Sequence, residues 1–150
     1  MKLRTFGTLL VATAFVASGT LMAQPWRGWR GSGGWGPGSP YQRLYDPKTV
    51  QTINGTVESV DKAMPLRGMS AGIHLMVKTE KATLRVDLGP EWYIQRLDTK
   101  IAKGDAVEVK GSMVKIDGKD ALIAAEVKKG GEALVLRDAA GVPAWAGWRR

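Results

Sequence analysis

The sequence predicts an all-β domain, a small five-stranded barrel with one short helix between its third and fourth strands. In residues 72–89 apolar and polar side chains alternate on both sides of a short polar turn. Such alternation is typical of a β-hairpin that buries one face. Residues 106–114 and 121–128 also alternate, and they flank Asp117-Gly118, a dipeptide favoured in tight hairpin turns. The two hairpins and one further strand account for the five predicted strands.

The first strand is expected over residues 50–60, where Gly55 allows a bend or bulge. The helix is expected over residues 90–97, because Pro90 suits its first position and an acidic residue follows in the first turn. We expect one of its two aromatic residues to pack against the end of the barrel. Residues 132–137 add a short sixth strand.

Composition excludes several kinds of chemistry. The 150 residues suffice for one domain and contain no cysteine, which rules out disulfides, Cys-linked haem, Cys-ligated zinc and a thiol nucleophile. The single histidine, His74, lies on a predicted strand without the partners of a catalytic triad, and no phosphate-binding loop or His-Glu-x-x-His motif is present. We therefore expect a protein that is not an enzyme and needs no cofactor.

Residues 1–23 have the features of a secretory signal. Lys2 and Arg4 precede an apolar run over residues 6–16, and Ala23 is a small residue suited to cleavage. No second apolar stretch follows, so the mature chain is expected to lack a transmembrane segment and to be periplasmic or secreted. Its 20 basic and 14 acidic residues give a net charge of +6 after removal of the signal.

The remaining segments are a flexible linker and lead-in over residues 24–48, a domain over 49–138 and a tail over 139–150. The linker and the tail both contain the pattern W-x-G-W-R. Tryptophan and arginine together can stack on bases and neutralise phosphates, which predicts an alternative function in polyanion or nucleic-acid binding. Its residues would be Trp26, Arg27, Trp29, Arg30, Trp148, Arg149 and Arg150. For the C-terminal copy, packing of Trp145 on the barrel is the favoured interpretation.

Three strands, a short helix and two strands follow the connectivity of the OB-fold. On residues 55–60, 104–111 and 123–125, the chain resembles exported bacterial OB-fold proteins, and the resemblance covers residues 49–128. It implies a binding module that uses the outward face of the second and third strands and the loop before them. The expected ligand-binding residues are His74, Met76, Lys78, Arg85, Arg67 and Met69. The partner would be a ligand or protein of the cell envelope.

A second alternative is Cu(I) binding. His74 and Met76 share one face of a strand, about 7 Å apart, and Met64 or Met69 from the preceding loop could complete a site of soft ligands. In this respect the chain is distantly similar to periplasmic OB-fold copper chaperones, which bind Cu(I) through one histidine, two methionines and a tryptophan. It departs from them because it lacks their closely spaced Trp-Met-Met residues.

Overall fold

The computed structural model describes residues 32–147. The signal, the N-terminal W-x-G-W-R copy and Trp148 to Arg150 therefore lie outside the described residues. Within them, the strands are β1 (Val50–Ala63), β2 (Gly72–Lys78), β3 (Thr83–Pro90), β4 (Ala106–Ile116), β5 (Lys119–Lys129) and β6 (Glu132–Val135). The helix α2 (Glu91–Ile94) and two 3-10 turns, η1 (Gln42–Leu44) and η2 (Pro47–Thr49), complete the elements.

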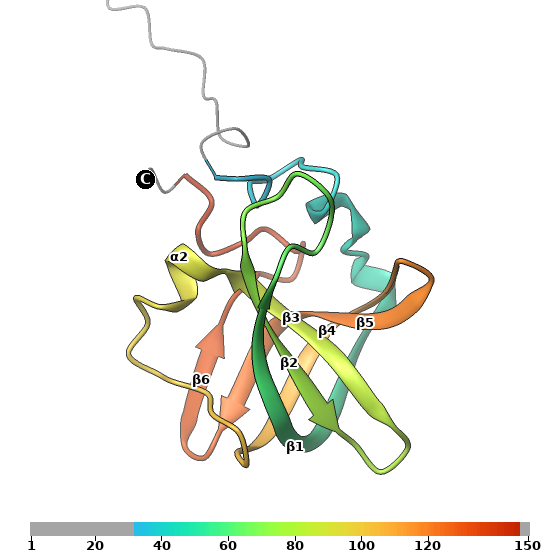
Figure 1. The fold of residues 1–150 in the computed structure, drawn as a ribbon, viewed down its shortest axis with the longest axis vertical. Helices are drawn as coiled ribbons and strands as arrows, with labels where there is room; N and C mark the ends of the chain where they lie inside the picture. The colour runs from blue at the N-terminus through green and yellow to red at the C-terminus, as the bar shows by residue number, and fades with distance from the viewer. Residues whose placement is uncertain (1–31, 148–150) are drawn as a thin grey trace, which may run out of the picture.

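The strands form one sheet in the order β3-β2-β1-β4-β5-β6, and a parallel pairing between β3 and β5 closes it into a ring (Figure 1). The predicted all-β class and the helix between the third and fourth strands are confirmed. The helix ends at Ile94, earlier than expected, and the strand after Gly131 is a sixth member of the sheet. No helix in the part of the chain that the structure describes is long and apolar enough to cross a membrane.

Strand β1 bends so that it can pair with two neighbours. Its first half, up to Thr56, pairs with β4, and the half from Thr56 onwards pairs with β2. Gly55 lies at the bend, where a Cβ atom would meet the backbone of Lys78 and lie 2.7 Å from Cγ1 of Val77. A bulge follows between Val57 and Ser59. The glycine is therefore required by close approach of the backbone, as its position in the sequence predicted.

Alternating side chains of the strands fill the ring. Leu75, Val77, Val86, Val109 and Leu122 are completely inaccessible to solvent. They come from four strands, and burial of their apolar surface is the main favourable contribution to the free energy of folding. In the hairpin, the alternating apolar side chains point inward as the sequence predicts and are buried, except that Leu84 is only partly buried. The buried ones are Ile73, Leu75, Val77, Val86 and Leu88.

Residues 32–49 do not fit the expectation of a flexible linker. Trp35 and Tyr41 are each 1% exposed, and Trp35 donates a hydrogen bond from Nε1 to the carbonyl of Ser70 at 3.1 Å. We call residues 32–49 the N-terminal strap. The sequence failed to predict it because glycine and proline dominate its composition, whereas its few aromatic side chains supply the buried area.

Residues 136–147, the C-terminal strap, pack beside the N-terminal strap. Trp145 is 2% exposed, as predicted, and donates from Nε1 to the carbonyl of Trp35 at 2.8 Å. The two indole rings meet edge to face with centroids 6.3 Å apart. Gly72 and Gly89 provide room for these rings on β2 and β3. The packed fold thus extends beyond both ends of the domain predicted over 49–138, and both described ends leave the ring at the same end (Figure 1).

Candidate binding sites

The outward face of β2 and β3 carries most of the predicted ligand-binding residues. His74 lies between Asp61 on β1 and Asp87 on β3, with Nε2 3.9 Å from Oδ2 of Asp61. Its side chain is 16% exposed. Met76, the next outward residue, is opposite Arg85. The structure therefore brings His74, Met76 and Arg85 together on one face, next to the exposed Lys78.

Part of this face is already covered by the protein's own chain. Asp87 accepts hydrogen bonds from Nε and Nη2 of Arg85 at 2.6 and 3.2 Å and from the hydroxyl of Tyr41 at 2.9 Å. Asp87 is 1% exposed beneath the N-terminal strap. Burial, reinforced by the charge of Asp87, raises the pKa of Tyr41 well above its usual value. Arg85 is thus engaged by an internal carboxylate, and only the half of the face around Met76 and Lys78 remains open to a partner.

The two loop methionines lie in different environments. Met69 is 8% exposed and packs against the N-terminal strap, where a Cβ atom on Gly34 would lie 2.8 Å from its Cγ. Met64 is 62% exposed. Arg67, on the same loop, is exposed as well. The described residues contain no cluster of three or more His, Cys, Asp or Glu side chains able to hold a metal ion. Packing therefore commits Met69 to the core, whereas Met64 remains exposed on the same loop.

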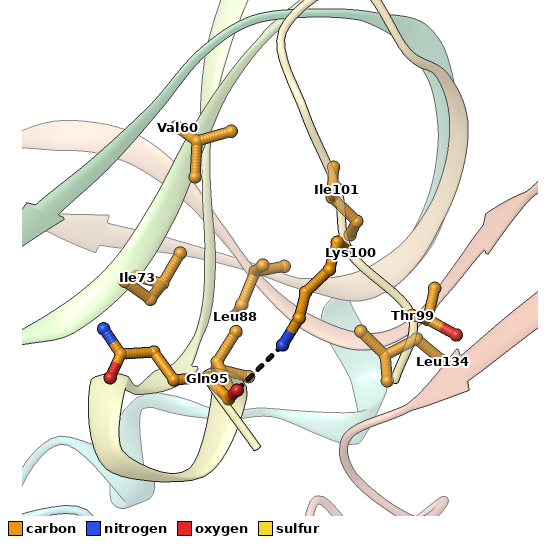
Figure 2. A pocket seen from close by; sticks show the side chains of 9 residues that line it. Val60, Ile73, Leu88, Gln95, Thr99, Lys100, Ile101 and Leu134 are labelled. Atoms are coloured by element: carbon orange, nitrogen blue, oxygen red, sulfur yellow. Dashed lines mark hydrogen bonds between the residues drawn. The ribbon is translucent and has the colours of Figure 1, made fainter. Parts of the chain in front are cut away.

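An apolar pocket that sequence reasoning missed lies between β1, α2 and β6 (Figure 2). It has a volume of about 250 Å³ and an apolar lining of Val60, Ile73, Leu88, Ile94, Ile101 and Leu134. Gln95, Thr99 and Lys100 form its polar part, and Nζ of Lys100 donates to the carbonyl of Gln95 at 2.8 Å. Such a concave, mostly apolar site with few polar groups is typical of a binding pocket.

The pocket follows from the unequal lengths of the strands. Val60 is opposite the buried Leu75 on β2, yet it is 40% exposed. Strand β1 loses its partner β4 after Thr56, so the inner face of its second half has no neighbouring strand on that side. The short helix and the loop over residues 95–105 cover this seam only in part. The pocket is built from five separate segments, so no local sequence pattern could have indicated it.

The net charge of +8 is distributed unevenly along the chain. Residues 32–147 contain 16 basic and all 14 acidic side chains, a balance of only +2. The other six cations lie in residues 1–31 and 148–150. The described fold is therefore close to neutral, and the polyanion alternative depends on arginines outside the described residues.

Comparison with known proteins identifies a family for the ring. Residues 49–134 match the MamS/MamX magnetosome protein family. The chain belongs to this family. No curated protein matches the chain, and the comparisons give no support to the likeness to copper chaperones. In this MamS/MamX family member, the match begins at η2 and ends in β6, so every residue that lines the apolar pocket lies within it.

Proposed function

We propose that this chain is an exported, non-catalytic binding module that acts at the magnetosome. It would bind a partner protein by accepting an apolar side chain in the pocket between β1, α2 and β6. The pocket carries this proposal, because it combines an apolar lining with an opening to solvent at Val60. The family's description supports the location. The predicted signal supports export, and the mature protein should begin near Gln24 when its mass is measured.

A side chain of a partner fits this pocket better than a charged ligand. Six of the nine lining residues are apolar, and Lys100 already donates its hydrogen bond to the loop that it belongs to. Removing an apolar side chain from water contributes about 1.5–3 kcal/mol. One such anchor surrounded by polar contacts is the common arrangement of a protein interface. The exposed Val60 extends the apolar surface to the rim, where the anchor would enter.

The open half of the outward face, around Met76 and Lys78, is the competing surface. Met76 favours it, since a partly buried thioether lies there among polar neighbours on the outside of the sheet. The two surfaces lie on opposite sides of the sheet, so substitutions can test each one separately. If the partner bound this face, the chain would still be a binding module, but its interface would lie on the outward face of the sheet and not at the apolar pocket.

Fractionation of cells that produce magnetosomes tests the proposal. Val60→Asp places a charge at the rim of the pocket and should release the protein from the magnetosome fraction. Val135→Asp is the matched control, because Val135 is 58% exposed on β6 and does not line the pocket. Met76→Asp tests the competing face. Retention of Val60→Asp beside loss of Met76→Asp would refute the pocket, and absence of the wild-type protein from the fraction would refute the location.

A further inference from the structure

The net positive charge of the mature chain is confined to three parts of the sequence. Residues 24–45, 64–71 and 139–150 contain six arginines and no acidic residue. The rest of the mature chain, residues 46–63 and 72–138, contains 14 basic and 14 acidic residues and is neutral. The charge of +6 therefore belongs entirely to segments that lie far apart in the sequence. The arginines are Arg27, Arg30, Arg43, Arg67, Arg149 and Arg150.

The described parts of these segments pack together at one end of the molecule. The amide of Ser70 donates to the carbonyl of Gly33 at 2.9 Å, and Nε1 of Trp35 donates to the carbonyl of Ser70 at 3.1 Å. Trp145 donates in turn to the carbonyl of Trp35 at 2.8 Å. Both described ends of the chain leave the fold here (Figure 1). We call this part of the fold the basic end, and it consists of residues 32–45, 64–71 and 139–147.

The two arginines within the basic end are available to an external anion. Arg43 and Arg67 are exposed, and no carboxylate of residues 32–147 forms an ion pair with either of them. The neutral remainder differs, since several of its cations have a partner, as Lys115 has in Asp120 at 2.7 Å. Exposed cations of one sign produce a positive potential that attracts anions to this end of the protein.

The other four arginines follow directly from the same end. Arg30 is two residues before Ser32, and Arg149 is two residues after Gly147. Two residues of chain span at most about 7 Å, so the Cα atoms of both arginines must lie close to the basic end. The same two terminal segments also contain three tryptophans, Trp26, Trp29 and Trp148. The fold thus gathers at one end all the excess positive charge of the mature chain.

The chemistry of the basic end favours an anionic lipid surface over a nucleic acid. Proteins that bind single strands use aromatic rings on which the bases stack, yet the aromatic residues of the basic end are all 8% exposed or less. An apolar side chain is exposed instead, because Met64 is 62% exposed three residues before Arg67. An exposed apolar side chain beside cations, with tryptophans close by in the chain, is typical of binding to a membrane interface. The buried aromatic residues are Trp35, Tyr41, Tyr45 and Trp145.

We propose that the basic end binds the surface of a membrane that contains anionic lipids. Its arginines contact the lipid phosphates, Met64 enters the interface, and the tryptophans of the two terminal segments add apolar contact. None of the residues that line the apolar pocket belongs to the basic end. The pocket therefore stays available to a partner protein while the chain is on a membrane, and the two proposals can fail independently.

Sedimentation of the full mature chain with lipid vesicles tests this proposal. Vesicles made of equal parts of phosphatidylcholine and phosphatidylglycerol should carry the protein into the pellet at low salt, whereas vesicles of pure phosphatidylcholine should not. Added NaCl should release the protein, because salt screens interactions between exposed charges. Equal binding to both kinds of vesicle, or binding to neither, overturns the proposal. A single-stranded DNA oligonucleotide that displaces the protein at an equal concentration of phosphate groups also overturns it and identifies nucleic acid as the ligand.

Two substitutions that remove the same charge show which end makes the contact. Arg67→Gln should lower the affinity for anionic vesicles about fivefold, the factor that one basic residue near such a surface contributes. Lys81→Gln is the matched control, because Lys81 is exposed in the turn after β2, whereas Arg67 is in the loop before it. The control should leave the affinity nearly unchanged, and thermal melts should show that both variants are folded. Equal losses of affinity would mean that net charge alone attracts the protein, and would overturn the proposal.

Met64→Ser tests the apolar part of the contact without changing the net charge. It should weaken binding to anionic vesicles and leave the dependence on salt unchanged, because the arginines remain in place. Unchanged vesicle affinity in this variant would exclude insertion of Met64 and leave a purely electrostatic contact, contrary to the proposal.

Discussion

Gly72→Ala tests whether the N-terminal strap is an integral part of the fold. A Cβ atom at Gly72 would overlap Cζ2 of Trp35 and lie 2.5 Å from Cη2, more than an ångström closer than normal carbon contacts. The same Cβ atom would also lie 3.1 Å from the carbonyl oxygen of Gly89, which is closer than an ordinary van der Waals contact. Either the ring stays and the core is overpacked, or the ring leaves its site.

The two outcomes have different costs. Overpacking of this kind costs about 1–3 kcal/mol. Release of a fully buried tryptophan forfeits about 150–250 Å² of burial, an upper bound of about 4–6 kcal/mol. Release would also break the hydrogen bonds of Trp35 with Ser70 and Trp145. We therefore expect unfolding free energy to fall by about 2–4 kcal/mol, which lowers Tm by about 10 °C in a domain of this size.

Thermal melts and urea unfolding measure the loss, and tryptophan emission distinguishes the outcomes because a released Trp35 shifts to longer wavelength. Gly131→Ala is the matched control: the same substitution at a glycine that has a negative φ and no atom within 4 Å of the added Cβ. It should change stability by less than about 0.5 kcal/mol. If Gly72→Ala were as stable as this control, with unchanged emission, the strap would be dispensable and the packing argument would be wrong.

Three further predictions concern the buried network, the copper alternative and the terminal segments. Because burial raises the pKa of Tyr41, the unfolded state ionises first; stability should be intact below about pH 10 and fall above it, and Tyr41→Phe should weaken this fall in urea titrations across pH 9–11. Anaerobic Cu(I) titration against a chelator should give equal affinities for wild type and His74→Ala, since Met69 is held in the core; a large loss in the variant would restore the copper site. Any polyanion binding should fall steeply with salt and vanish when residues 24–31 and 148–150 are deleted, because these segments carry four of the six excess positive charges of the mature chain.

The ring was predictable because its signals are local. Alternation in residues 72–89 identified the hairpin, Asp117-Gly118 identified the next turn, and both follow from the two-residue period of a strand. The straps were not predictable in the same way. Trp35 is buried by its contacts with Gly72 and Trp145, which are distant in sequence, and the glycines around it indicate flexibility when they are read alone.

The candidate sites depend even more on distant contacts. Alternation in the sequence correctly indicates that Arg85 and Asp87 lie on the outward face of β3. It does not indicate that this part of the face is closed to a ligand, because Tyr41, from a distant segment, covers Asp87. The apolar pocket arises where segments fail to meet, because β1 continues beyond the last residue of its pairing with β4. Alternation predicts which residues a sheet buries. It does not indicate where packing remains incomplete.

The straps also explain why the partner should be sought away from the usual OB-fold surface. Three aromatic side chains of the straps cover part of the outward face of β2 and β3 that a ligand would otherwise contact: Trp35, Tyr41 and Trp145. Exposing them to solvent would cost several kcal/mol before any new contact forms. A partner that used this area would have to displace them first. The apolar pocket requires no such displacement, because it opens to solvent at Val60 on the other side of the sheet. The energetic cost of opening the straps therefore favours binding at the apolar pocket.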